Sequence, residues 1–385
     1  MRCRALIRAF LPLAGLLLAA SAAAPAGPPR AKNVILMVGD GMGFSLVTAG
    51  RLAKGGVDGP PLSFETLDRF GYQRIYSADG VIADSAATAS AWACGAKFSN
   101  GALCFHGDGR VAPPSLLDLA RERGRAIGLV ATSAITHATP AAFGASVPDR
   151  RCESEIARQY LVETKVDLLL GGGMSSFQSA AKDPCGGGGE DYVALARREG
   201  YTVVTSAAGL RAATGTGKLL GLFATEELTR VQARPEDSTE PTLAEMTAAA
   251  LDRLAQDRDG FFLLVEGSQI DWGGHDNDLS YAVSELLAFD EAVRVTQAWI
   301  AARRERAAQT LLIVLADHET GGLALVGPRD RPAATAPVKV TPHWATAGHT
   351  AADAPLWSSG PGSAELGGLV DNTKIYDVVR GALAK

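Results

Sequence analysis

Short, continuous runs of apolar residues recur along the chain, and each is followed by Gly, Asp or Ser. The clearest runs are NVILMVGDGMG (33–43), AIGLVATS (126–133), VDLLLGGG (166–173), GFFLLVEGSQ (260–269) and QTLLIVLADHETGG (309–322). Continuous rather than alternating apolar runs are typical of parallel strands that are buried on both faces. We therefore predict a largely parallel sheet built from these runs.

Helical patterns lie between the apolar runs, as in SLLDLARERG (115–124), TLAEMTAAALDRLAQD (242–257) and AVSELLAFDEAVRVTQAWIAARRER (282–306). Strands that alternate with helices indicate an α/β protein. The stretches 185–191 and 327–340 are expected to be loops, and no internal repeat is visible. We predict a three-layer α/β/α sandwich that forms a single domain over residues 25–385.

The first residues, MRCRALIRAFLPLAGLLLAASAAAPAGPPR, have a basic start, an apolar stretch and a region of small residues. This order predicts a secretory signal peptide over residues 1–24, cleaved near Ala22 to Ala24. The alternative is a transmembrane anchor, but Pro12 interrupts the apolar stretch. We expect a periplasmic or secreted protein without a stable membrane anchor.

Composition and cysteine content narrow the class of protein. The 385 residues are 47% hydrophobic and 21% charged, with a net charge of −5, so a sizeable core is expected and a nucleic-acid partner is not. Four cysteines follow the leader, which suits two disulfides in an exported chain. Among the three possible pairings we favour Cys94–Cys104 and Cys152–Cys185, because each closes a local loop; a buried free thiol at Cys94 is the alternative.

Carboxylates follow three of the predicted strands. Asp40 ends the first, Glu266 and Asp271 follow FFLLV, and Asp317 and His318 end LLIVLA. Because ligand sites in open parallel sheets form at the carboxyl ends of strands, these groups should share one edge. So many negative charges could not all stay ionised without cations between them, which indicates metal binding. Each motif taken alone has a simpler explanation. GDGMG is then a glycine turn, EGSQIDWGGHDND (266–278) a solvated acidic loop, and ADHETGG a hydrogen-bonded turn.

Histidines complete the candidate metal ligands. Asp271 and His275 are four residues apart and share a face if the segment is helical. One carboxylate and one imidazole suit zinc. His349, in a glycine-rich turn, is a further candidate, although an isolated histidine is more often a loop residue.

Two more segments carry candidate chemistry. In VIADSAATASAWACGAK (81–97), Asp84 and Ser85 look like the start of a helix, so Ser85 is either a helix cap or a nucleophile. The segment 132–151 contains His137, Thr139, Arg150 and Arg151. An arginine there could grip an anion with two parallel hydrogen bonds, although an arginine pair is usually solvated surface.

Taken in order, GDGMG, ADSAATASAWACG, THATPAAFGASVPDR, VEGSQIDWGGH, ADHETGG and GHT strongly resemble the alkaline phosphatase family over residues 33–380. The resemblance implies hydrolysis of small phosphate monoesters through a phosphoserine, with two Zn²⁺ and one Mg²⁺ per subunit. It implies Ser85 as nucleophile and Arg150 as phosphate clamp, with Arg151 as the fallback. It assigns one zinc to Asp271, His275 and His349, the other to Asp40, Asp317 and His318, and the magnesium to Asp40, Thr139 and Glu266.

Two positions depart from the best-known enterobacterial pattern of the family. His137 stands where that pattern has Asp, and Trp272 where it has Lys. Both are expected near the substrate, where they bear on the third metal site and on the affinity for inorganic phosphate, the product inhibitor. The segment between Asp317 and His349 is too short for the family's large crown insertion. The natural substrate and the oligomeric state, with a homodimer as one option, stay open.

Alternative functions predict different motifs in the sequence. A sulfatase would carry a Cys- or Ser-x-Pro-x-Arg motif at the nucleophile, which DSAATA lacks. Diesterases of the related branch usually have a threonine nucleophile and lack the third-site ligands. A phosphate-binding protein or inactive homologue would be expected to lose Ser85 or a metal ligand, and none is missing.

Overall fold

A computed structural model describes residues 30–178, 183–186, 189–327, 338 and 340–384. The predicted signal peptide (1–24) lies outside the described residues, as do most of the predicted loop 327–340 and part of the loop 185–191. Within the described part of the chain, no helix is long and apolar enough to cross a membrane.

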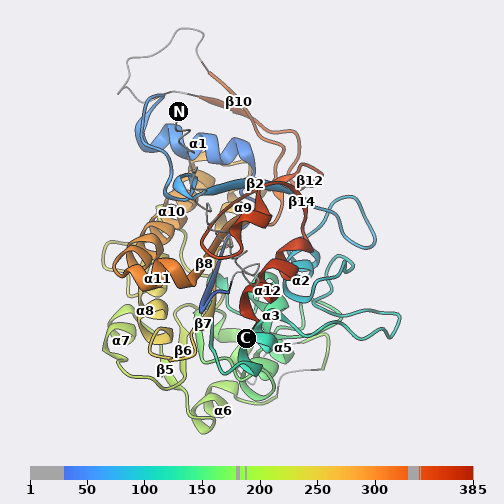
Figure 1. Cartoon of the computed structure of the whole chain (residues 1–385), viewed down its shortest axis with the longest axis vertical. Helices are drawn as coiled ribbons and strands as arrows, with labels where there is room; N and C mark the ends of the chain where they lie inside the picture. The colour runs from blue at the N-terminus through green and yellow to red at the C-terminus, as the bar shows by residue number, and fades with distance from the viewer. Residues whose placement is uncertain (1–29, 179–182, 187–188, 328–337, 339, 385) are drawn as a thin grey trace, which may run out of the picture.

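A ten-stranded sheet forms the middle of the molecule (Figure 1). Its strand order is β14 (Gly368–Asp371), β2 (Arg69–Arg74), β13 (Ala354–Ser359), β8 (Thr310–Ala316), β1 (Asn33–Gly39), β7 (Phe261–Gly267), β3 (Ala126–Ala134), β4 (Leu168–Gly172), β6 (Leu219–Leu222) and β5 (Thr202–Val204). Only β13 runs antiparallel to its neighbours β2 and β8. The five apolar runs are β1, β3, β4, β7 and β8, so the predicted parallel core is confirmed.

Alternate residues of the central strands face two separate cores. In β1, Val34, Leu36 and Val38 belong to one hydrophobic cluster, whereas Ile35 and Met37 belong to the other. All seven residues of β1 are buried. Burial on both faces explains why this strand is a continuous apolar run in the sequence.

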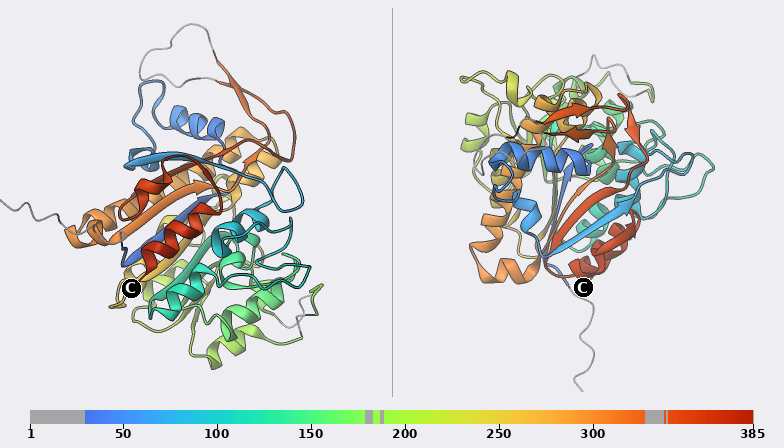
Figure 2. Two further views of the ribbon diagram at one scale, coloured as in Figure 1. Left: turned by 45° about the vertical axis from the view of Figure 1, so that its right-hand side comes forward. Right: turned by 90° about the horizontal axis from the view of Figure 1, so that it is seen from above.

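Helices cover both faces of the sheet (Figure 2). One core includes residues of α2 (Ser85–Cys94), α3 (Leu116–Glu122), α4 (Ala138–Gly144), α5 (Glu153–Val162), α6 (Tyr192–Arg198) and α12 (Lys374–Leu383). The other core includes residues of α1 (Phe44–Gly55), α7 (Ala207–Ala212), α8 (Leu243–Leu254), α9 (Gln269–His275) and α10 (Leu279–Ala301), and α11 (Arg304–Gln309) follows α10. The predicted three-layer sandwich is therefore confirmed.

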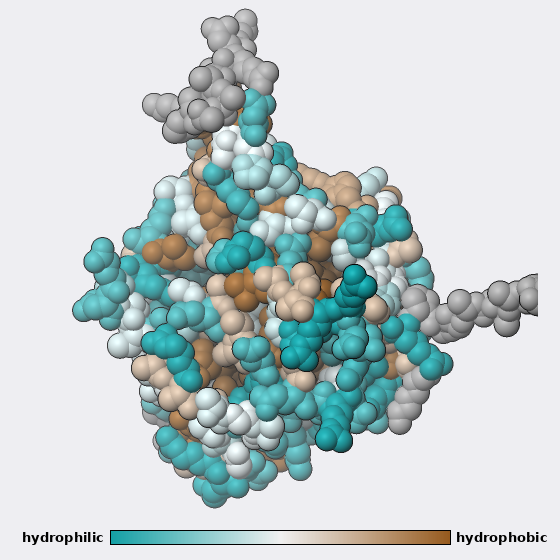
Figure 3. All heavy atoms as spheres, turned by 60° about the vertical axis from the view of Figure 1, so that its left-hand side comes forward, coloured by the Kyte–Doolittle hydropathy of each residue, from teal (hydrophilic) through white to brown (hydrophobic). Residues whose placement is uncertain are grey.

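Short elements connect these layers. Two-stranded sheets pair β10 (Ala324–Val326) with β11 (Thr341–His343) and β9 (Glu319–Thr320) with β12 (His349–Thr350). Single 3₁₀ turns are η1 (Ser63–Thr66), η2 (Met174–Phe177), η3 (Val231–Ala233) and η4 (Ser363–Leu366). On the face shown in Figure 3, hydrophilic residues predominate, with smaller hydrophobic patches between them.

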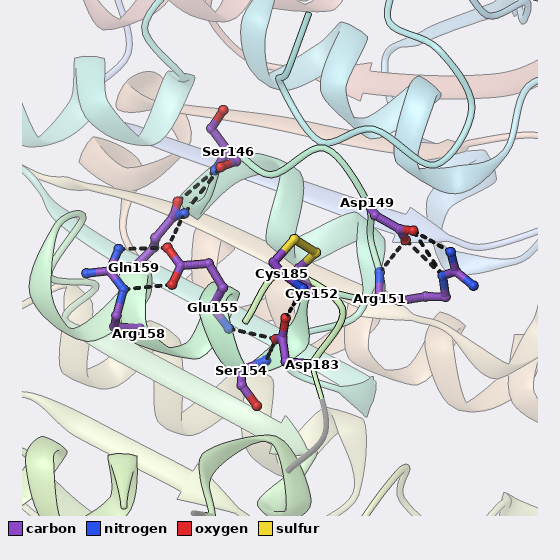
Figure 4. Close-up of a disulfide and its surroundings, with 10 residues drawn as sticks. All are labelled: Ser146, Asp149, Arg151, Cys152, Ser154, Glu155, Arg158, Gln159, Asp183 and Cys185. Carbon is purple, nitrogen blue, oxygen red and sulfur yellow. Dashed lines mark hydrogen bonds and ion pairs between the residues drawn. A yellow bond between two sulfur atoms is a disulfide. The ribbon is translucent and has the colours of Figure 1, made fainter. Parts of the chain in front are cut away.

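Both predicted disulfides are present, Cys94–Cys104 and Cys152–Cys185. Cys94 is therefore not a free thiol. The second disulfide brings the segment with Asp183 to the start of α5, where the carboxylate accepts hydrogen bonds from the backbone N–H groups of Ser154 and Glu155 (Figure 4). Two disulfides are consistent with a protein located outside the cytoplasm.

Candidate active site

The predicted carboxylates meet at the carboxyl ends of three adjacent strands. Asp40 follows β1, Glu266 lies near the end of β7, and Asp317 follows β8. In the sheet β1 lies between β7 and β8, and Val38 pairs with Glu266 while Gly39 pairs with Ala316. The three carboxylates thus come from neighbouring strands in nearly the same register.

At this edge of the sheet, among the described residues, three groups of side chains bring potential ligand atoms within 4.8 Å of one another. The groups are Asp271–His275–His349, Asp40–Asp317–His318 and Asp40–His137–Glu266. The first two contain the same residues as the two zinc sets that the sequence suggested. The third contains His137 beside Asp40 and Glu266, at the place expected for magnesium. Thr139, expected there too, is fully buried in α4.

Several buried oxygens at these groups have no hydrogen-bond partner among the described residues. They are both carboxylate oxygens of Asp40, Asp317 Oδ2, Glu266 Oε1 and Thr139 Oγ1. A buried polar atom without a partner is costly, so such atoms normally bond to something. Carboxylate and hydroxyl oxygens with imidazole nitrogens nearby form a donor set that suits divalent cations. The residues present therefore fit the metals that the sequence suggested.

Burial and mutual repulsion perturb the carboxyl groups. Burial raises the pKa of Asp40 well above its usual value, and the negative charge of Asp317 adds to the effect. Burial also raises the pKa of Glu266 to about 7. Burial opposes ionisation of Asp317 as well, but the adjacent His318 imidazolium prevails and lowers its pKa. The protein without cations therefore holds part of this charge protonated or paired with histidine.

Backbone carbonyls orient the two histidines of the first group. Nδ1 of His275 lies 2.6 Å from the carbonyl oxygen of Ala347, and Nδ1 of His349 lies 3.1 Å from that of Ala83. Their Nε2 atoms are 3.2 Å apart, and His275 Nε2 is also 3.1 Å from Asp271 Oδ2. The hydrogen bond to Asp271 raises the pKa of His275 to about 9. Two imidazoles turned toward one carboxylate are arranged to share a cation.

Ser85 is the first residue of α2, and Asp84 rather than Ser85 is the helix cap. The Asp84 side chain accepts a hydrogen bond from the N–H of Ala87. The alternative in which Ser85 caps this helix is therefore wrong. Its Oγ lies 3.2 Å from His318 Nε2, at the helix N-terminus, where the dipole favours negative charge.

Arg150 lies against Asp84, the residue before Ser85, whereas Arg151 points away. Arg150 Nη1 donates to Asp84 Oδ2 at 3.2 Å, and its Nη2 lies 2.9 Å from His137 Nε2. Arg151 instead pairs with Asp149, as Figure 4 shows, and its side chain is 78% exposed. The geometry thus favours Arg150 over Arg151 as the anion clamp.

Trp272 and His137 lie next to each other at this site. Trp272, from α9, packs edge to face against His137, with ring centroids 6.2 Å apart. Burial and the charge of Arg150 lower the pKa of His137 to about 3, so its imidazole is neutral. His137 thus contacts both Arg150 and Trp272.

Three supporting residues were missed by sequence reasoning. Thr320 Oγ1 donates a short hydrogen bond to Asp271 Oδ1, and Ser268 Oγ donates to Glu266 Oε2 at 2.7 Å. Asp84 was expected to cap a helix but not to hold Arg150. Ser268 and Thr320 lie within the motifs VEGSQIDWGGH and ADHETGG, and that position is the one sequence signal that could have drawn attention to them.

A serine at the start of a helix lies beside three groups of potential metal ligands at the edge of the sheet. This is the arrangement of a metal-dependent hydrolase. The profile of the family "Alkaline phosphatase" matches residues 31–339. The chain belongs to this family.

Several known proteins are similar to this chain over most of its length. Streptomycin-6-phosphate phosphatase of Streptomyces griseus is 36% identical, with 95% of this chain and 93% of the relative covered. Alkaline phosphatase 3 of Bacillus subtilis is 39% identical over 76% of this chain, which spans only 62% of that relative. The alkaline phosphatase of the Antarctic bacterium TAB5 superposes with a TM-score of 0.79 at 30% identity, covering 93% of this chain and 99% of the other. A TAB5 variant with aspartate in place of a histidine has magnesium bound in its M3 site.

Proposed function

We propose that the chain hydrolyses phosphate monoesters through a phosphoserine at Ser85, releasing an alcohol and inorganic phosphate. The observation that supports this best is the position of Ser85 Oγ, which lies at the N-terminus of α2 and 3.2 Å from His318 Nε2. The nucleophile thus lies beside one of the three ligand clusters, within a site that Arg150 borders.

We propose that the three clusters hold two Zn²⁺ and one Mg²⁺. Asp271, His275 and His349 would hold one zinc, and Asp40, Asp317 and His318 the other. Asp40, Thr139 and Glu266 would hold magnesium, with His137 near enough to affect metal choice. When bound, such cations act as Lewis acids that lower the pKa of an oxygen nucleophile and stabilise charge on the leaving oxygen.

The chain's own residues would bind and orient the ester. Arg150 presents its guanidinium to two phosphoryl oxygens, while Asp84 holds that guanidinium in place. Ser85 Oγ attacks phosphorus as the bond to the alcohol oxygen breaks, and the alcohol leaves with a proton. Water then attacks the phosphoserine, which releases inorganic phosphate and restores the Ser85 hydroxyl.

Trp272 and His137 would tune product affinity. Neither side chain carries a positive charge, since Trp272 offers one N–H donor and the His137 imidazole is neutral. A bound phosphate dianion is then held mainly by Arg150 and the cations. We therefore propose weak inhibition by inorganic phosphate and fast product release.

We further propose that residues 1–24 direct export and that residues 25–385 form the catalytic domain in the periplasm or outside the cell. The substrates would be small phosphate monoesters, and a homodimer is a candidate assembly. The streptomycin phosphate in the name of one relative is not carried over to this chain, because the residues described do not distinguish one alcohol from another.

A comparison of three substrates tests the proposal. The metal-loaded protein should hydrolyse an aryl phosphate monoester far faster than the matching diester or sulfate ester. Preference for the diester or the sulfate would refute the assignment in favour of another branch of the superfamily. Binding of phosphate without turnover of any ester would indicate a binding protein.

A further inference from the structure

A cavity of about 400 Å³ lies behind the candidate active site, between α8, α10, the η3 segment and the end of β7. Small residues are among those that line this space, namely Ala244 of α8, Ala288 of α10 and Gly267 of β7. Most of its surface is apolar, with Leu243 among the lining residues. Its size is within the range of small-molecule sites in proteins.

One buried carboxylate lines this cavity. Glu285 is 5% exposed, and its Oε1 accepts a hydrogen bond from the N–H of Val231 at 2.7 Å. Among the described residues, its Oε2 has no hydrogen-bond partner and no ion pair engages the carboxylate. The two other lining glutamates are both paired, Glu245 with Arg211 at 3.0 Å and Glu291 with Arg294 at 2.5 Å.

The lining arginine is engaged elsewhere. Arg234 donates to the carbonyl oxygens of Pro241 and Thr229 and lies 3.5 Å from Glu240. Burial raises the pKa of Glu285 and prevails over the hydrogen bond from Val231 and the charges of Arg234 and Arg230, which lower it. The ionised Glu285 is thus a buried charge that lacks a direct counter-ion. Supplying one would be favourable, because an unpaired buried charge is costly.

We propose that this cavity binds a small organic ammonium ion, with the ammonium at Glu285 Oε2 and an apolar body of benzyl size against Ala244 and Ala288. A cation is favoured over an anion, because Glu245, Glu291 and Arg234 each have an ion-pair partner and, among the described residues, Glu285 does not. No residue of the candidate active site is needed for this binding.

A wall of hydrogen-bonded residues separates the cavity from Ser85. Thr132 lines the cavity, and its Oγ1 accepts a hydrogen bond from the N–H of Ser268 at 2.9 Å. Ser268 Oγ in turn donates to Glu266 Oε2 at 2.7 Å. An ammonium ion bound at Glu285 would therefore not compete with phosphate bound at Ser85.

Calorimetric titration of the metal-loaded protein with benzylamine, a cation at about pH 7.5, tests the proposal. We expect saturable binding with a Kd on the order of 1 mM, a reasonable affinity for so few atoms. Saturating inorganic phosphate should leave this binding unchanged. Benzyl alcohol, which has the same ring but no charge, should bind about tenfold more weakly.

Three variants locate the site. Glu285→Gln keeps an oxygen for the Val231 N–H but loses the charge, and should weaken benzylamine binding about tenfold. Ala288→Leu should weaken benzylamine binding, because the larger side chain takes the space against which the ring is proposed to pack. Glu291→Gln, at a paired lining glutamate, is the matched control and should bind as the wild type does.

The proposal is overturned if benzylamine shows no saturable binding or is displaced by phosphate. It is also overturned if benzyl alcohol binds equally well, or if Ala288→Leu binds benzylamine with unchanged affinity. Should Glu285→Gln fail to fold, the alcohol comparison and Ala288→Leu still decide the question.

Discussion

Replacing Gly43 by alanine should destabilise the protein through one specific collision. Gly43 precedes α1 with φ of −67°, a backbone conformation that alanine adopts freely. A Cβ added there would lie closer than 3.0 Å to Glu319 Cγ. The effect of the substitution is therefore steric and does not come from backbone strain.

The Glu319 side chain cannot easily move aside. Its carboxylate accepts hydrogen bonds from the N–H groups of Gly322 and Leu323, both at 3.2 Å, and a short one from Thr350 Oγ1. Each such bond contributes about 0.5–1.5 kcal/mol net, so releasing all three would cost more than a modest repacking. Overpacking typically costs about 1–3 kcal/mol, which is the loss in unfolding free energy that we expect.

The collision should also disturb the proposed zinc site, because β9, which contains Glu319, pairs with β12, which contains His349. Urea unfolding of the metal-loaded proteins measures the stability loss, and a zinc-chelator competition measures the affinity of the site. Gly348→Ala is the matched control, since its nearest atom would be Thr346 Oγ1 at 3.7 Å. A Gly43→Ala variant within about 0.5 kcal/mol of wild type, with unchanged zinc affinity, would refute the reasoning.

Further expectations concern the metals, the nucleophile, the product and pH. Exhaustive chelation should abolish activity and lower the Tm, and full activity at verified zero metal content would contradict the metal assignment. Ser85→Ala should lose most monoesterase activity but keep its fold and metals, because Asp84 provides the cap; near wild-type turnover would exclude Ser85 as nucleophile. Trp272→Lys should tighten inhibition by inorganic phosphate through an added ammonium, and an unchanged inhibition constant in a folded variant would count against this. Burial raises the pKa of Glu285, so the folded state binds more protons than the unfolded state, and stability falls as pH rises from the ordinary glutamate pKa through the raised one. Urea unfolding should therefore show Glu285→Gln gaining stability relative to wild type as pH rises above about 4.3, the ordinary glutamate pKa, and a loss of relative stability over that rise would contradict the sign.

The centre of the fold could be predicted from the sequence because β1, β7 and β8 are buried on both faces and read as unbroken apolar runs. The same pattern failed at the sheet's margins. In β2, Arg69 and Phe70 are exposed while Gln73 is fully buried, donating to the carbonyl of Ala316 and accepting from Trp92. In β2 a polar side chain is buried and an aromatic side chain is exposed, which is the opposite of the hydrophobic pattern expected of a strand. Hydrophobic periodicity would therefore not have identified this strand.

The candidate ligands could be predicted because they follow strand ends or share a helical turn, but their supports depend on distant partners. Thr320 donates to Asp271, which is 49 positions earlier in the chain. Gly43 must lack a side chain because of Glu319, a residue in another motif. Such requirements arise only when the strand ends are packed together, and no local pattern encodes them.

His137 links the proposed third metal site to the proposed phosphate clamp, Arg150. Arg150 Nη2 lies 2.9 Å from His137 Nε2, so a neutral imidazole that accepts this hydrogen bond has its second nitrogen protonated. That nitrogen, Nδ1, is buried without a hydrogen-bond partner among the described residues. The ring can serve Arg150 as an acceptor, or it can turn toward Asp40 and Glu266 as a ligand, but Nε2 cannot do both. The metal bound at the proposed third site and the orientation of Arg150 therefore both depend on the His137 imidazole. Sequence motifs treat His137 and Arg150 as independent positions and do not show this dependence.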